Sequence, residues 1–109
     1  MNSLSTHVLD TAVGRPAPGI RVSLSRDDAM LGSARTDSDG RVREFGGAAT
    51  ALSPGNYQLT FFVAEYFSNA GRECFFPDIV IRFTMGAGPQ HYHVPLLLSP
   101  FGYSTYRGN

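Results

Sequence analysis

The side chains of this 109-residue chain that are best suited to chemistry are its three histidines. His7 lies near the start, whereas His91 and His93 lie near the end and are separated by one residue. A neutral imidazole takes up a proton near pH 7, so histidines brought together can supply a general base and a group that orients water. The His-x-His spacing, with a third histidine elsewhere, is also compatible with zinc and an open position for water.

An arginine and the last four residues are further candidates. Arg41 directly follows a predicted turn at residues 37–40, and its planar guanidinium suits a carbonyl or anionic oxygen. The sequence closes with Tyr106, Arg107, Gly108 and Asn109. Terminal residues are usually disordered unless something holds them. Because the pattern just upstream predicts strands, we expect this segment to be held beside a reaction site.

Composition argues against several classes of function. Lys plus Arg and Asp plus Glu balance at 9 each, which disfavours a nucleic-acid or anionic membrane partner. No apolar run approaches the ~20 residues of a membrane span, and no secretory signal is evident at the start. Cys74 is the only cysteine, which excludes an internal disulfide and fits a reducing compartment, and its neighbours offer nothing to activate the thiol. We therefore expect a cytoplasmic protein.

Several known site motifs are missing from the sequence. There is no Gly-x-Ser-x-Gly elbow, phosphate loop or dinucleotide glycine pattern. The Asp37-x-Asp39-Gly40 run lacks the distal ligand of a calcium loop, so a plain turn explains it. The zinc interpretation of the histidines stays open, although no nearby carboxylate is evident as an outer-shell partner.

Most of the chain alternates between apolar and polar residues, as half-buried strands do. One segment differs, because residues 63–70 can form two helical turns with Gly71 placed to end them. Residues 27–32 are expected to form a loop and residues 33–36 a weak strand. About seven or eight short strands, one short helix and frequent Gly/Pro turns predict an all-β fold, an antiparallel β-sandwich forming a single domain over residues 1–109.

The alternation also predicts which side of each strand the histidines occupy. In the strand at residues 91–99 the apolar side chains share one face, so His91 and His93 project from the other, ~7 Å apart along the strand. In the first strand Leu4, Thr6 and Val8 are expected to face the core, which leaves Ser3, Ser5 and His7 on the outer face. If the two strands are neighbours, the histidines share that face. They are then either solvated side chains or the lining of a cleft made with another subunit.

Five separated blocks of the sequence resemble the transthyretin-like 5-hydroxyisourate hydrolases. The similarity covers nearly the whole chain, and its C-terminal block is highly specific. The blocks are Ser5-Thr6-His7-Val8-Leu9-Asp10 with Gly14-Arg15-Pro16-Ala17, Thr36-Asp37-Ser38-Asp39-Gly40-Arg41, Phe75-Phe76-Pro77, His91 through Ser99, and Tyr103 through Gly108.

The resemblance implies a transthyretin fold of two four-stranded sheets with a short helix after the fifth strand. It also implies a homotetramer, a dimer of dimers, with active sites at the dimer–dimer interface. By this resemblance, His7, Arg41 and His93 are the expected catalytic groups. The residues from Tyr106 to Asn109 are expected to bind the substrate beside them, and we add His91 to these substrate-binding residues. The tetrapeptide of the family usually ends in serine where this chain has Asn109, whose amide still donates and accepts hydrogen bonds.

The implied reaction is hydrolysis of 5-hydroxyisourate to 2-oxo-4-hydroxy-4-carboxy-5-ureidoimidazoline in urate catabolism. A histidine is expected to activate water while Arg41 stabilises the developing oxyanion. No metal or other cofactor is expected, because the substrate is already electrophilic. The competing function is that of a non-catalytic carrier of the transthyretin type, which binds a small molecule in the central channel of the same fold.

Overall fold

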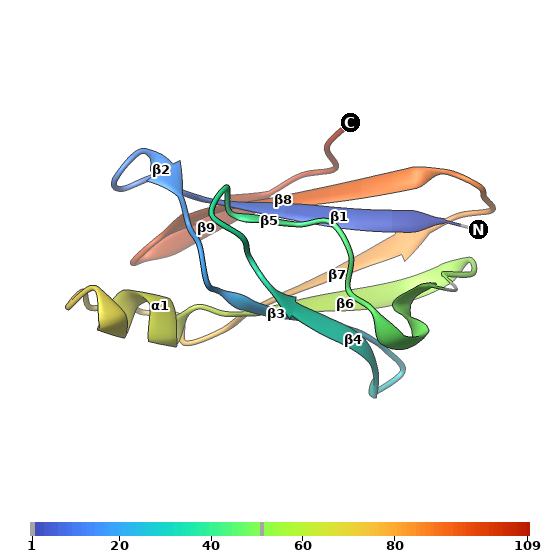
Figure 1. Ribbon diagram of the computed structural model, residues 1–109, viewed down its shortest axis with the longest axis horizontal. Coiled ribbons are helices and arrows are strands. Elements are labelled where there is room, and N and C mark those ends of the chain that lie inside the picture. Colours follow the sequence, from blue (N-terminus) through green and yellow to red (C-terminus); the bar gives the residue numbers. More distant parts are fainter. Residues whose placement is uncertain (1, 51) are drawn as a thin grey trace.

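The strands form two layers that face each other across an apolar interior (Figure 1). The computed structural model describes residues 2–50 and 52–109. One sheet contains β1, β2, β5, β8 and β9, and the other contains β3, β4, β6 and β7. The bounds are β1 Ser3–Asp10, β2 Arg15–Pro16, β3 Arg21–Arg26, β4 Ala29–Arg35, β5 Arg41–Val42, β6 Gly55–Phe62, β7 Ile79–Met85, β8 His91–Ser99 and β9 Gly102–Thr105, with a 3-10 turn at Gly47–Thr50 and helix α1 at Ala64–Asn69.

In the first sheet, β1 and β8 lie side by side and run parallel, with Ser3 opposite His91 and Asp10 opposite Leu98. This pair is the exception to the antiparallel pairing that the sequence predicts, and it joins the two ends of the chain. The other edge of β1 is shared, because β2 pairs with its last two residues and β5 pairs with Thr6 and His7. The sheet therefore contains five strands, one more than the resemblance implies, because two short strands share this edge of β1.

The second sheet has the order β4-β3-β6-β7 and is antiparallel throughout. Its first hairpin differs from the expectation of a loop at residues 27–32. Strand β4 begins at Ala29, and only Asp27 and Asp28 form the turn, with φ angles of 51° and 65°. Positive φ at both central positions is what a two-residue hairpin turn requires, and aspartate tolerates it. The sequence pattern predicted that Asp27 and Asp28 belong to a longer loop. The twist of the flanking strands instead favours a tight two-residue turn at these positions.

The core is built from the alternate residues that the sequence pattern assigns to it. In β1 the side chains of Leu4, Thr6 and Val8 are buried, and in β8 those of Tyr92, Val94, Leu96 and Leu98 are buried. The second sheet contributes a matching set from its inner face: Val22, Leu24, Tyr57, Leu59, Phe61, Ile79, Ile81 and Met85. Because strand side chains alternate between faces, burial of these residues forces Ser3, Ser5, His7, His91 and His93 to the outer face.

Helix α1 follows β6 and ends where the sequence predicts. Its Phe67 is buried, which anchors this short helix to the core. Gly71 has a φ of 66° and donates its N–H to the carbonyl of Ser68 at 3.0 Å, and the Arg72 N–H returns to the Phe67 carbonyl at 2.9 Å. A left-handed residue of this kind after a helix satisfies carbonyls that the helix leaves open, and glycine adopts it without a steric penalty.

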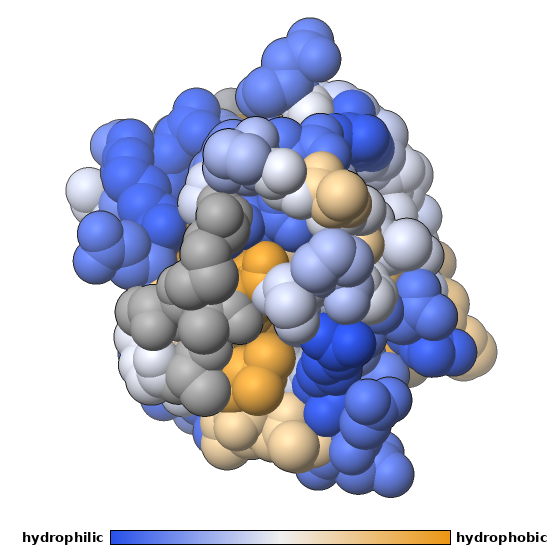
Figure 2. Space-filling view, turned by 90° about the vertical axis from the view of Figure 1, so that its right-hand side faces the viewer, coloured by the Kyte–Doolittle hydropathy of each residue, from blue (hydrophilic) through white to orange (hydrophobic). Residues whose placement is uncertain are grey.

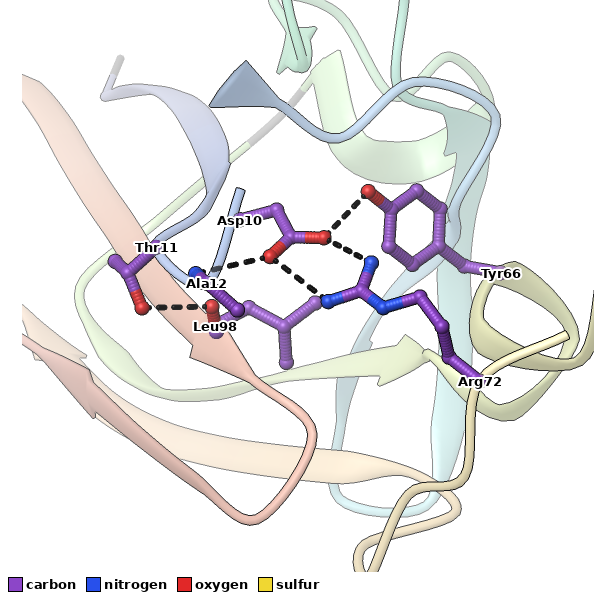
Figure 3. A network of polar contacts seen from close by, with 6 residues as sticks. All are labelled: Asp10, Thr11, Ala12, Tyr66, Arg72 and Leu98. Atoms are coloured by element: carbon purple, nitrogen blue, oxygen red, sulfur yellow. Dashed lines mark hydrogen bonds and ion pairs between the residues drawn. The ribbon is translucent and has the colours of Figure 1, made fainter. Parts of the chain in front are cut away.

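A buried carboxylate ties α1 to the end of β1 (Figure 3). The Asp10 side chain is 0% exposed and accepts hydrogen bonds from Arg72 Nη1 at 2.6 Å and from Tyr66 Oη at 2.7 Å. The Ala12 N–H also donates to it at 3.2 Å. Burial alone raises the pKa of Asp10, but the hydrogen bonds and the charge of Arg72 outweigh that effect, so the pKa lies below 3.8. The network connects the end of β1 to α1 and the segment after it through polar contacts.

Replacing Asp10 with asparagine is expected to lower the free energy of unfolding by about 3 kcal/mol, because Arg72 loses its partner in a largely buried site. The pKa of Asp10 is lower in the folded state than in the unfolded state, so the ionised carboxylate stabilises the fold at neutral pH. This stabilisation is lost as the pH falls below 3.8 and then through the pKa of the folded state. Urea unfolding of both proteins at fixed concentration measures the difference. Glu65→Gln is the control, because its ion pair with Arg35 is exposed and should contribute less than about 1 kcal/mol. Equal losses in the two variants would contradict the structural role of Asp10.

The end of the sandwich that carries the N-terminus presents a mostly hydrophilic surface, with the most hydrophobic residues visible near the centre and weakly hydrophobic ones below them and at the right-hand edge (Figure 2). Within the described ranges, 2–50 and 52–109, no helix is long and apolar enough to cross a membrane.

Candidate functional site

The three histidines lie on the same outer face of the first sheet. The parallel register of β1 and β8 places Ser5 opposite His93 and His7 opposite Pro95. His7 and His93 are therefore diagonal neighbours on two adjacent strands, as expected if the strands pair. This arrangement brings together imidazoles from the two ends of the chain.

Arg41 joins this face from the other edge of β1, where β5 places it directly opposite His7. The turn before it is held by Asp37, whose carboxylate accepts hydrogen bonds from the N–H groups of Asp39 and Arg41 at 2.9 and 3.0 Å. The same turn aims the Asp39 carbonyl at His7, whose Nε2–H donates to it at 2.8 Å. Because a carbonyl only accepts, His7 carries its proton on Nε2, which leaves Nδ1 as its basic nitrogen.

A shallow hollow of about 320 Å³ opens on this face beside the histidines. It is lined by residues of three strands and the segment after β5, namely Ser5, Thr6, Arg41, Arg43 and His91. The two guanidinium groups give the hollow a positive character. Such a lining suits an oxygen atom that gains negative charge during a reaction.

His93 is held on two sides. Its Nδ1 lies 2.8 Å from Ser5 Oγ, and the Gly108 N–H donates to the His93 carbonyl at 2.8 Å. Gly108 lies so close to the ring that a Cβ at that position would be 2.6 Å from His93 Cδ2. Glycine is therefore the residue that allows the C-terminal segment to lie against the imidazole.

The surroundings of His93 favour its neutral form. Burial lowers the pKa of His93 below its usual 6.5, and electrostatic repulsion from the neighbouring Arg41, His7 and His91 groups lowers it further, against a smaller opposite effect of Ser5. An imidazole with a lowered pKa is unprotonated near pH 7. His93 is thus able to accept a proton from water there.

The C-terminal segment reaches the site through its backbone, whereas two of its side chains turn away from the histidines. The Arg107 guanidinium lies 4.6 Å from the centre of the Tyr92 ring and donates to Gln90 Oε1 at 3.0 Å. Tyr106 and Arg107 line a second hollow with Ile81, Phe83, Val94 and Thr105, at the edge between the two sheets. Among the described residues, Arg107 therefore secures the segment, and Gly108 is the member that lies beside His93.

Sequence reasoning missed the groups that hold the histidines. Ser3 and Ser5 were assigned to the outer face, but their contacts with His91 and His93 depend on the parallel register, which alternation alone does not predict. The alternating Ser3-x-Ser5-x-His7 run, set against His91-x-His93, was the available signal. As for zinc, the described residues contain no cluster of three or more His, Cys, Asp or Glu side chains placed to hold a metal ion.

The sandwich and its outer-face histidines define a protein of the transthyretin fold. Transthyretin from Sparus aurata superposes with a TM-score of 0.88 at 26% identity, over 99% of this chain and 97% of that one. The Klebsiella pneumoniae 5-hydroxyisourate hydrolase superposes with a TM-score of 0.89 at 42% identity, over 100% and 94%.

The chain belongs to the HIUase/Transthyretin family, whose model matches residues 4–108. The curated 5-hydroxyisourate hydrolase 2 of Rhizobium meliloti is 47% identical to it, over 97% of this chain and 95% of that protein. The curated 5-hydroxyisourate hydrolase of Salmonella typhimurium is 42% identical, over 99% and 82%. These comparisons confirm the family resemblance, the fold class and the prediction that the protein is an enzyme.

Proposed function

We propose that this protein hydrolyses 5-hydroxyisourate to 2-oxo-4-hydroxy-4-carboxy-5-ureidoimidazoline. The observation that carries the proposal is the grouping of His7, Arg41 and His93 on one sheet face, in a chain that is 42–47% identical to curated 5-hydroxyisourate hydrolases. A carrier has no need for a neutral imidazole beside a guanidinium group.

The proposed reaction uses water and the side chains of this face. His93 takes a proton from water at Nε2, and the water oxygen forms a bond to a ring carbonyl carbon of the substrate. Arg41 stabilises the negative charge that develops on the carbonyl oxygen, which is the larger electrostatic contribution. The carbon–nitrogen bond of the six-membered ring then breaks, and the proton held by His93 passes to the leaving nitrogen. His7, with Nδ1 free, orients the water or the substrate.

We further propose that the site is completed in a homotetramer, a dimer of dimers. Two features support assembly. The hollow beside the histidines is shallow and open, so a second copy covering it would exclude bulk water. Large aromatic side chains are also exposed outside the site, with Phe75 at 71%, Phe101 at 66% and Tyr103 at 42%. Contiguous exposed apolar residues of this kind mark interaction surfaces. The cytoplasmic location and the absence of a cofactor stay predictions.

The purified protein is expected to accelerate the loss of 5-hydroxyisourate absorbance well beyond its spontaneous decay, without added metal. The measurement is the initial rate in matched solutions with and without protein, before and after treatment with a chelator. The His7→Ala/His93→Ala double variant serves as the control for contaminating activity. Saturable binding of the substrate with no increase in its decay would favour the carrier, and activity lost on chelation would restore the zinc interpretation.

A further inference from the structure

We infer that Ser5 is a positioning residue for the reaction: its hydroxyl, held by His91, fixes the tautomer and ring orientation of His93 so that Nε2 faces the substrate. This inference rests on the proposed function, because it assigns Ser5 a role through the proposed base.

The contacts form one continuous chain along the outer face of β1 and β8. Ser3 Oγ lies 2.6 Å from His91 Nδ1, Ser5 Oγ lies 2.8 Å from His91 Nε2, and the same Ser5 Oγ lies 2.8 Å from His93 Nδ1. Each distance is that of a well-formed hydrogen bond. Ser3 and His91 are exposed, whereas Ser5 and His93 are half-buried, so the chain leads from solvent to the proposed base.

One arrangement of protons along this chain satisfies every contact while His93 acts as a base. Its Nε2 is then bare, so Nδ1–H donates to Ser5 Oγ. Ser5 has one hydroxyl proton, which it donates to His91 Nε2. His91 therefore carries its own proton on Nδ1 and donates it to Ser3 Oγ. Reversing every bond would place the proton of His93 on Nε2 and remove its ability to accept one from water.

The other contacts of His93 do not determine which ring nitrogen carries the proton. Among the described residues, the hydrogen bonds of the His93 ring reach Nδ1 alone, and Gly108 lies against the Cδ2 edge. The charged or titratable groups that act on the ring are His7 from β1, Arg41 from β5 and His91 from β8. The Arg41 guanidinium repels a second proton on the ring but has no lone pair to accept one from Nδ1, and no hydrogen bond joins His7 to His93 among the described residues. Ser5 is thus the hydrogen-bond partner of the His93 ring, and by accepting from Nδ1–H it holds the tautomer whose Nε2 is bare.

The experiment compares Ser5→Ala, Ser5→Thr and the control Ser23→Ala in the tetrameric protein. Ser23 is a half-buried serine on β3, in the other sheet. We expect Ser5→Ala to lower kcat roughly 10- to 100-fold with KM changed less than about 3-fold, because the wrong tautomer impairs proton transfer more than binding. Ser5→Thr keeps the hydroxyl and should restore most of kcat, and Ser23→Ala should match the unmodified protein.

Nitrogen-15 NMR of the histidine rings gives a second measurement that does not depend on turnover. At neutral pH the His93 Nδ1 should carry the proton in the unmodified protein and in Ser5→Thr, and Ser5→Ala should show a mixture of tautomers. A normal kcat in Ser5→Ala, or His93 protonated on Nε2 in the unmodified protein, would overturn the role of Ser5. If the unmodified protein failed to hydrolyse the substrate, the proposed function would fail instead, and the NMR result would still decide the tautomer.

Discussion

The His93→Ala variant is expected to hydrolyse 5-hydroxyisourate with a kcat/KM about 10²–10⁴-fold below that of the unmodified protein, the usual contribution of a positioned general base. The expectation rests on three features of the ring: its lowered pKa, its support by Ser5 and Gly108, and its place beside Arg41 and His7 on one sheet face. Initial rates across a range of substrate concentrations give kcat and KM separately.

Two controls distinguish a catalytic loss from a structural one. Gln58→Ala removes a half-buried polar side chain from the outer face of β6, in the sheet that lacks the histidines, and should leave the rate unchanged. Added imidazole should partly restore the rate of His93→Ala, because it supplies the missing base to the space that alanine leaves. A near-normal rate for His93→Ala would remove His93 from the mechanism.

The same base sets the acidic limb of the pH dependence. The pKa of His93 lies below 6.5, so the imidazole remains neutral at pH 7 and becomes protonated only in more acidic solution. In the unmodified protein kcat/KM should therefore stay high at neutral pH and fall at an apparent pKa below 6.5. That limb should be absent from the residual activity of His93→Ala.

Deleting the last four residues of this sequence, Tyr106 to Asn109, is expected to lower kcat/KM at least ~100-fold while the sandwich remains folded. Gly108 packs against His93, so its loss frees the ring to move, and a displacement of about 1 Å in a reacting group can cost that much. The fold should survive because β9 ends at Thr105, before the deleted segment. Circular dichroism and the unfolding midpoint test the fold separately from the rate.

Two single substitutions show which part of this segment matters. In Gly108→Ala the added Cβ would lie 2.6 Å from His93 Cδ2, so the ring must shift and most of the activity should be lost without shortening the chain. Asn109→Ser should retain activity, because both side chains donate and accept hydrogen bonds. If the shortened protein turned over substrate normally, the segment would have a structural role alone.

Alternation was sufficient to predict the faces of β1 and β8, because burial of every second residue leaves no other orientation for His7 and His93. It was not sufficient to predict the direction of pairing. A strand sequence looks the same whether its neighbour runs parallel or antiparallel, and the choice depends on the whole topology. The contacts of Ser5 follow from that choice, which is why the sequence analysis left Ser5 without a role.

Some turns and side-chain positions could also be predicted from the sequence, whereas others could not. Gly71 was recognisable as a helix end, because glycine after a short helical pattern has one common use. Asp27 and Asp28 were not recognisable as a two-residue turn, because acidic residues occur in loops of every length. The positions of Tyr106 and Arg107 also escaped prediction, because they depend on Tyr92 and Gln90 at the sheet edge.

The pairing of the first and penultimate strands has a consequence for biosynthesis. Ser5 and His93 are 88 residues apart in sequence, so at 5–20 residues per second a ribosome needs roughly 4–18 s to add the segment that completes the pair. Throughout that interval the edge of the nascent β1 that pairs with β8 lacks its partner. An unpaired strand edge of this kind is prone to wrong pairing, and the chemical groups of the outer face can meet only after β8 has been made.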